Sequence, residues 1–220
     1  MQIVALGGGG TTEAVHGAIL ALASRQPPRV LYVGTAGAED PRTALMVYDR
    51  LRGKAEVSHL QFFPWPPEDL RERTLAQDVI YVGGGNTANM LAIWRVHGFD
   101  RILREAWEGG IVLAGGSAGM ICWFEAGITD SFGPQLEAMR DGLGFLPGSA
   151  CPHYDDEELR RPFYRRAVDG GFPAGCAADA GVGLHFVGTE LAEVLSPREG
   201  ATAYRVEPGS EMPLDARIVG

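Results

Sequence analysis

A serine within a run of small residues is the strongest candidate for chemistry in this sequence. The segment Gly115-Gly116-Ser117-Ala118-Gly119 fits the pattern Gly-x-Ser-x-Gly, which places a nucleophilic serine on a sharp turn between a strand and a helix. Small neighbours permit such a turn, and the first amides of the following helix, above all that of Ala118, would face a developing oxyanion. The pattern predicts acyl transfer through Ser117. The alternative interpretation is a glycine turn in which the serine has no role.

A nucleophilic serine needs a base, and the sequence offers five histidines. His153 follows Pro152, which stiffens the chain, and it precedes the acidic run 155–158. We predict that His153 is the general base. The remaining histidines fit packing, surface or capping positions in predicted helices and strands: His16, His59, His97 and His185.

A carboxylate should orient the imidazole, and the sequence leaves several candidates. Asp130 is predicted in the turn that follows the helix after Ser117, and Glu125 near the end of that helix, about two turns from the serine. Asp155 and Asp156 neighbour the histidine, but acidic runs are usually solvated. The order serine, acid, histidine is that of α/β-hydrolases. The spacing here is too compact for that fold, so a different scaffold is implied.

Short apolar runs alternate with segments of helical periodicity along the chain. Strands are predicted at 2–6, 29–33, 57–62, 78–82 and 111–113, and helices at 12–24, 41–51, 86–96 and 101–107. Later strands at 181–186, 191–195 and 203–206 are expected to extend the same sheet, some of them antiparallel. This order predicts one α/β domain over residues 1–220, a three-layer sandwich with a mostly parallel central sheet.

Three glycine-rich segments follow predicted strands, at the edge of the sheet where ligands of such folds bind. The first, Gly7–Gly10, does not fit the dinucleotide fingerprint Gly-x-Gly-x-x-Gly, which argues against a nucleotide there. The second, Gly83–Thr87, could supply a further oxyanion donor, and its Asn86 also fits the N-cap of the next helix. The third carries Ser117.

Composition and charge argue against several other classes of protein. The chain has 28 acidic and 19 basic residues and a net charge of −9, which disfavours nucleic-acid and anionic-membrane partners. No apolar run approaches the roughly 18 residues that cross a bilayer. The three cysteines lack the spacing of a metal site or a disulfide framework. We therefore expect a cytoplasmic protein that binds a small molecule without a metal or other cofactor, and a homodimer is compatible with the sequence.

Taken together, these motifs resemble the peptidase E (aspartyl dipeptidase) family, which includes cyanophycinase. The resemblance rests on Gly83–Thr87, Ser117-Ala118-Gly119 and Pro152-His153, and covers most of the chain. It implies a fold similar to class I glutamine amidotransferases, which is flavodoxin-like. It also implies a metal-independent serine peptidase that hydrolyses dipeptides or short peptides with an N-terminal aspartate, with Ser117 as nucleophile and His153 as base.

The same resemblance implies roles for further residues. Gly84 or Gly85, together with Ala118, would form the oxyanion hole. Asp130 best matches the triad aspartate of the family, and Glu125 is the substitute.

For the substrate, the resemblance implies a cation downstream of the histidine, at Arg160 or the adjacent Arg161, and a binding position at Asn86. Three alternatives share the fold: hydrolysis of β-aspartyl linkages as in cyanophycin, an amidotransferase-like activity, and a non-enzymatic binding or regulatory role. The serine at the elbow disfavours an amidotransferase, which would carry cysteine there, and Cys122 is expected to pack in the core.

Overall fold

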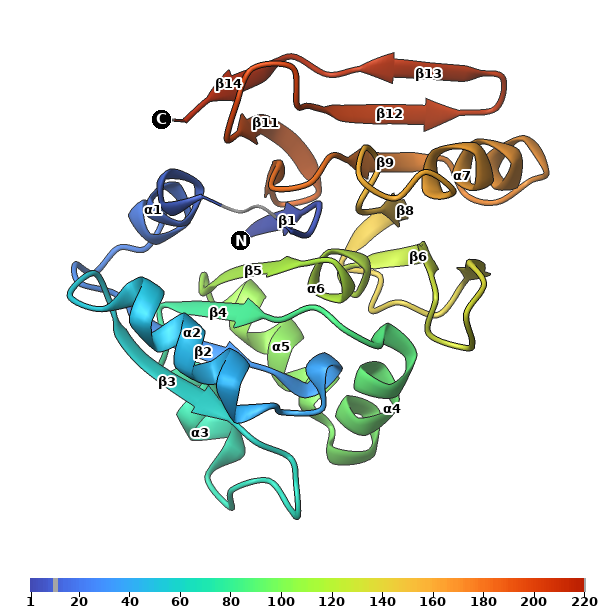
Figure 1. Cartoon of the computed structure of the whole chain (residues 1–220). Helices are drawn as coiled ribbons and strands as arrows, with labels where there is room; N and C mark the ends of the chain where they lie inside the picture. The colour runs from blue at the N-terminus through green and yellow to red at the C-terminus, as the bar shows by residue number, and fades with distance from the viewer. Residues whose placement is uncertain (10–11, 220) are drawn as a thin grey trace.

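A mostly parallel β-sheet forms the centre of the computed structural model, which describes residues 1–9 and 12–219 (Figure 1). Its strand order is β14-β11-β10-β1-β5-β4-β2-β3. The strands β1 to β5 pair in parallel, whereas β10 runs antiparallel to both β1 and β11. The bounds are β1 Gln2–Leu6, β2 Arg29–Val33, β3 Glu56–Leu60, β4 Val79–Val82, β5 Val112–Gly116, β10 Gly183–Val187, β11 Glu190–Ser196 and β14 Ala216–Ile218.

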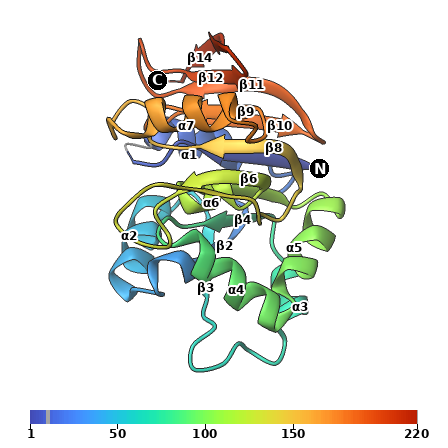
Figure 2. The same ribbon diagram turned by 90° about the vertical axis from the view of Figure 1, so that its right-hand side faces the viewer.

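Helices cover both faces of this sheet, as Figure 2 shows for α2 on one side and α3 and α5 on the other. Successive side chains of β1 point to opposite faces of the sheet, so each face has its own layer of helices. Ile3 packs in the cluster beneath α4 and α5, while Val4 packs in the cluster beneath α1. None of the helices in the described parts of the chain has the length and apolar character that a membrane span needs. The helices of the two faces are α1 Glu13–Ala21, α2 Pro41–Leu51, α3 Leu70–Leu75, α4 Thr87–His97 and α5 Phe99–Glu108, and a 3-10 turn, η1, spans Thr35–Gly37.

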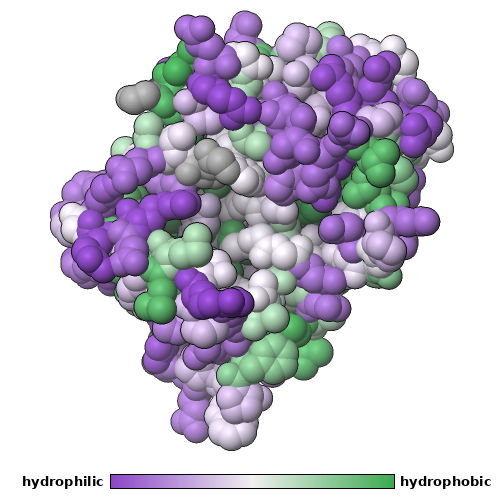
Figure 3. All heavy atoms as spheres, in the orientation of Figure 1, coloured by the Kyte–Doolittle hydropathy of each residue, from purple (hydrophilic) through white to green (hydrophobic). Residues whose placement is uncertain are grey.

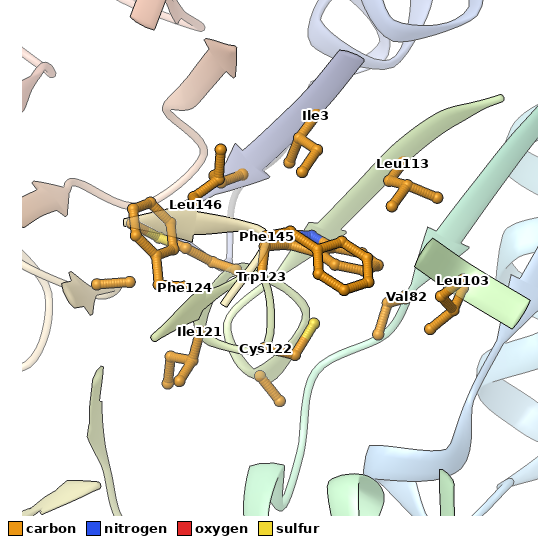
Figure 4. Packing of buried hydrophobic residues seen from close by; sticks show 14 of the residues in the cluster. Ile3, Val82, Leu103, Leu113, Ile121, Cys122, Trp123, Phe124, Phe145 and Leu146 are labelled. Carbon is orange, nitrogen blue, oxygen red and sulfur yellow. The ribbon is translucent and has the colours of Figure 1, made fainter. Parts of the chain in front are cut away.

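A second sheet, of order β13-β12-β9-β8-β6-β7, packs beside the first. The aromatic rings of Trp123, Phe124 and Phe145 fill the space where the chain passes from α6 into β6 (Figure 4). The elements of this part are α6 Ala118–Ile121, β6 Phe124–Thr129, β7 Glu137–Met139, β8 Leu146–Cys151, α7 Arg160–Asp169, β9 Gly175–Ala178, β12 Ala203–Glu207 and β13 Ser210–Pro213.

The α/β fold class and most elements of the first half agree with the sequence prediction. The helix predicted at 12–24 is shorter: α1 ends at Ala21, and the Leu20 carbonyl accepts the Ala23 amide at 3.2 Å and the Gln26 side-chain amide at 3.0 Å. The strand predicted at 203–206 was wrongly assigned to the central sheet, since β12 pairs with β9 and β13. The helix α3 and the second sheet were not predicted.

Gly175 lies where β9 passes too close to β8 for any side chain. A Cβ atom at Gly175 would stand 1.9 Å from the carbonyl oxygen of Ser149, whereas nothing lies within 4 Å of a Cβ at Gly17 in α1. We expect Gly175→Ala to lower the free energy of unfolding by about 1–3 kcal/mol through overpacking. Gly17→Ala should raise it by up to about 1 kcal/mol through helix propensity. Urea denaturation of both variants measures this, and equal midpoints would contradict the expectation.

Candidate active site

Ser117 sits on a strained turn at the end of β5. Its φ and ψ angles are 58° and −111°, a conformation that costs a non-glycine residue about 1–3 kcal/mol. The glycines on either side permit the turn, because a Cβ at Gly119 would lie 2.4 Å from the Val82 carbonyl oxygen and one at Gly115 would lie 2.7 Å from that of Gly119. Close packing of β4, β5 and α6 therefore requires glycine at both ends of the motif. This geometry is that of a nucleophile elbow.

The imidazole of His153 meets this serine. Its Nε2 atom lies 3.0 Å from the Ser117 hydroxyl oxygen, the distance of a hydrogen bond through which a proton can pass. His153 comes from the second sheet, just after β8, and also has a positive φ angle, 57°. A Cβ at Gly8 would lie 2.3 Å from His153 Nε2, so only glycine leaves room for the ring. The structure thus brings the predicted nucleophile and the predicted base together.

The end of β1 fixes the backbones of both residues. The amide of Ser117 donates to the Leu6 carbonyl at 3.1 Å, and the amide of His153 donates to the Gly7 carbonyl at 2.7 Å. The last residue of β1 and the residue after it therefore anchor the nucleophile and the base side by side.

Two carboxylates from the segment after His153 face the other nitrogen of its ring. Asp156 Oδ1 lies 3.3 Å from Nδ1 and Glu157 Oε1 lies 3.8 Å from it. Glu157 is held by the buried Arg160, whose Nε donates to it at 2.5 Å while Nη1 donates to the Ile128 carbonyl at 2.9 Å. These contacts suit a pair of carboxylates that keeps a proton on Nδ1 and leaves Nε2 free to accept one.

The acids chosen from the sequence lie elsewhere. Glu125 is not at a helix end, because α6 stops after one turn and Glu125 falls on β6, where its Oε2 accepts the Gly148 amide at 2.9 Å. Asp130 is exposed and directly follows β6. Within the described ranges, neither carboxylate forms a hydrogen bond or ion pair with His153. The reason is the spacing in the fold, because β6 leads away from the elbow and the chain returns to it only after β8.

Gly84 is the residue of the second glycine segment that lies beside the nucleophile. A Cβ at Gly84 would stand 3.7 Å from Ser117 Oγ, whereas one at Gly85 would collide with the Ala36 carbonyl at 2.1 Å. The Ala118 amide opens α6, where no intrahelical acceptor exists for it. The amides of Gly84 and Ala118 are therefore suitable donors for an oxyanion at Ser117.

Three further residues predicted to bind substrate are engaged elsewhere. Asn86 is an N-cap: its Oδ1 accepts the Asn89 amide and its Nδ2 donates to the Ser131 carbonyl, each at 2.8 Å. Arg161 pairs with Glu211 on β13. With Arg160 bound to Glu157, none of the three predicted residues lines the cavity at Ser117.

Residues later in the chain also anchor the segment around His153. Tyr154 donates its hydroxyl to Glu211 at 2.5 Å, and Asp155 accepts the Ala180 amide at 2.7 Å. Burial alone would raise the pKa of Glu211, but the hydrogen bonds from Tyr154 and Arg161 outweigh it and lower that pKa. Glu211 therefore stays ionised near neutral pH and continues to hold the tyrosine that follows the base.

A cavity of about 310 Å³ opens in front of the serine. The face drawn in Figure 3 is hollowed and pale at its centre, with both hydrophilic and hydrophobic residues around it. Gly10, the last residue of the first glycine segment, lies outside the described residues. No cluster of possible metal ligands occurs in the described ranges 1–9 and 12–219.

The residues that line the cavity at Ser117 are Gly8, Gly9, Arg50, Tyr81, Val82, Gly83, Gly84, Gly116 and Ser117.

Sequence reasoning missed Arg50 and Tyr81 in this cavity, and Glu157 beside the base. The carboxylates at His153 had a recognisable signal, since they follow the histidine by three and four residues within one turn of chain. Arg50 carried no signal, because it lies on a helix distant in sequence from every motif.

Comparisons with known proteins point to a peptidase family. The model of peptidase family S51 matches residues 3–194. An uncharacterized peptidase, YgaJ of Bacillus subtilis (strain 168), is 44% identical over 230 residues, which cover 100% of this chain and 99% of YgaJ.

Two solved structures share the fold. A peptidase from an acI-B1 Actinobacterium superposes with a TM-score of 0.72 at 17% identity and covers 98% of this chain and 94% of its own. A Listeria monocytogenes EGD-e protein assigned to peptidase E gives a TM-score of 0.57 at 15% identity, with 98% of each chain covered.

The contacts of His153 predict which acids matter. A double variant, Asp156→Asn with Glu157→Gln, should lower the rate at which a fluorophosphonate labels Ser117 by at least about 100-fold, because the imidazole loses its orienting carboxylates. The matched double variant, Glu125→Gln with Asp130→Asn, removes the same charge and should label within about threefold of the native rate. Mass spectrometry of the labelled protein measures both rates. If the Glu125→Gln and Asp130→Asn variant labelled more slowly than the other double variant, Glu125 or Asp130 would be the acid that orients His153.

Proposed function

The chain belongs to peptidase family S51, a family of serine-type peptidases, and we propose that it hydrolyses dipeptides and short peptides that begin with aspartate. The observation that carries the peptidase chemistry is the 3.0 Å contact between Ser117 Oγ and His153 Nε2 on a strained elbow. The preference for aspartate is what the resemblance of the motifs to peptidase E implies. A cavity in front of this pair and the amides of Gly84 and Ala118 beside it supply the other parts that acyl transfer needs.

The proposed reaction begins when His153 Nε2 takes the proton of the Ser117 hydroxyl. The serine oxygen attacks the peptide carbonyl carbon, and the amides of Gly84 and Ala118 bind the oxyanion that forms. The peptide C–N bond then breaks as the imidazolium gives its proton to the leaving amine. Asp156 and Glu157 lie against Nδ1 of the ring and fix its orientation.

Water completes the cycle. His153 takes a proton from a water molecule, whose oxygen attacks the acyl-enzyme carbonyl. The ester bond to Ser117 breaks, the serine oxygen recovers the proton from His153, and the free acid leaves. No metal ion is needed in this scheme, because the base generates the nucleophile in both halves of the reaction.

The proposal predicts that the chain hydrolyses an aspartyl p-nitroanilide and that Ser117→Ala reduces kcat by at least about 1000-fold. Release of nitroaniline measures the rate. Ser24→Ala is the control and should keep the native rate, because it removes an exposed serine hydroxyl that is distant in sequence from Ser117. Comparing an α-aspartyl dipeptide with the matching β-aspartyl dipeptide shows which of the two peptide linkages the protein cleaves.

Two results would contradict the proposal. If Ser117→Ala keeps the activity, another group is the nucleophile. If no aspartyl substrate is hydrolysed and fluorophosphonate does not label Ser117, the site is not a peptidase site and a binding role replaces it.

A further inference from the structure

A second cavity, of about 180 Å³, lies beneath α2 and borders the cavity at Ser117. Both cavities are lined by Arg50 and Tyr81 and by the glycines Gly83 and Gly84. A ligand bound at Ser117 can therefore extend a group along Gly84 into the space under the helix.

The strand order tells which end of a substrate points there. Ser117 follows β5, which lies between β1 and β4 in the sheet. The base His153 stands on the β1 side, against Gly8, and the leaving amine must lie near the base that protonates it. The second cavity opens on the opposite side, at β4 and β2. It therefore faces the residue that supplies the acyl group, which in a dipeptide is the N-terminal residue.

The lining of the second cavity favours a negatively charged side chain. None of the described residues that line either cavity carries a carboxylate, and Arg50 supplies the positive charge. Burial raises the pKa of Tyr81 to about 12, so its hydroxyl stays protonated and can donate a hydrogen bond. The sides of the cavity at Val47 and Leu51 are apolar and suit methylene groups.

His16 does not compete for the role of the cation. Its Nδ1 lies 2.8 Å from the carbonyl oxygen of Thr12, and burial lowers its pKa, so the ring is neutral near pH 7.

Arg50 differs from the arginines on either side of it, Arg42 in α2 and Arg52 just past its end. Arg42 pairs with Asp40 and Arg52 pairs with Asp49, each on the surface. The side chain of Arg50 forms no ion pair or hydrogen bond with any residue in the described part of the chain. Its guanidinium is thus available to a ligand, and a carboxylate can accept two of its N–H groups at once.

We propose that the cavity beneath α2 receives the side chain of the acyl residue and that Arg50 binds the carboxylate of that side chain. Because the cavity extends beyond Gly84, it accepts glutamyl as well as aspartyl residues and rejects lysyl and arginyl ones. This inference rests on the proposed function, since it takes Ser117 as the nucleophile.

The test compares aspartyl, glutamyl, leucyl and lysyl p-nitroanilides on the native chain and on Arg50→Gln. The variant should lower kcat/KM for the two acidic substrates by about 10- to 100-fold, the loss of a charged hydrogen bond, and leave the leucyl substrate within about threefold. Arg52→Gln removes an equal charge just past the end of α2, outside both cavities, and should change none of the four values. Charge reversal in Arg50→Glu should raise the lysyl value relative to the aspartyl one.

Several outcomes overturn the inference. An equal loss on every substrate would mean that Arg50 supports the fold or the chemistry, and no loss on any would mean that it does not meet the substrate. Labelling of Ser117 by fluorophosphonate without turnover of either acidic amide would also refute it, while leaving the nucleophile in place. Absence of both labelling and turnover would refute the proposed function itself, and the inference with it.

Discussion

The carboxyl end of β1 is the constraint on which the site depends. The two carbonyls in succession, of Leu6 and Gly7, accept the amides of Ser117 and His153. Ser117 follows β5 of the first sheet, and His153 follows β8 of the second sheet. The two carbonyls belong to consecutive residues, so the backbones of Ser117 and His153 are anchored beside each other. In this arrangement Ser117 Oγ lies 3.0 Å from His153 Nε2.

Holding two backbones against one strand end leaves no room for side chains between them. Added Cβ atoms would collide at Gly8 with the imidazole and at Gly115 and Gly119 with main-chain oxygens. This crowding explains part of the high glycine content, 31 of 220 residues. The strain of positive φ angles at Ser117 and His153 costs about 1–3 kcal/mol each and persists because the surrounding hydrogen bonds hold both residues. The buried aromatic core around Trp123 supplies the stability that offsets it.

Much of this arrangement could be predicted from sequence, and the failures have physical causes. Strand and helix periodicity located β1 to β5, because buried parallel strands are nearly continuous apolar runs. The second sheet was missed because β6 to β9 contain many glycines, alanines and polar residues, and their burial comes from packing rather than from an alternating pattern. The acids at the base were discounted because charged runs are usually solvated. Here the turn after His153 folds back, so that Asp156 and Glu157 face the ring while remaining about half exposed.

The arginines show why nearness in sequence to a catalytic residue is a poor guide to substrate contact. Arg160 is 3% exposed, and a buried guanidinium must keep its partners, here Glu157 and the Ile128 carbonyl. If Arg160 turned toward a substrate, Glu157 and the Ile128 carbonyl would lose their hydrogen bonds. Arg160 therefore acts on the base through Glu157. An exposed arginine can bind a substrate without breaking such contacts. The chain has a net charge of −9, and salt screens charges beyond about 10 Å, so an acidic substrate gains nothing from the field of the whole protein. Any preference for acidic residues must come from one cation close to the reacting carbonyl, and of the described residues that line the cavity at Ser117, Arg50 is the one that carries positive charge.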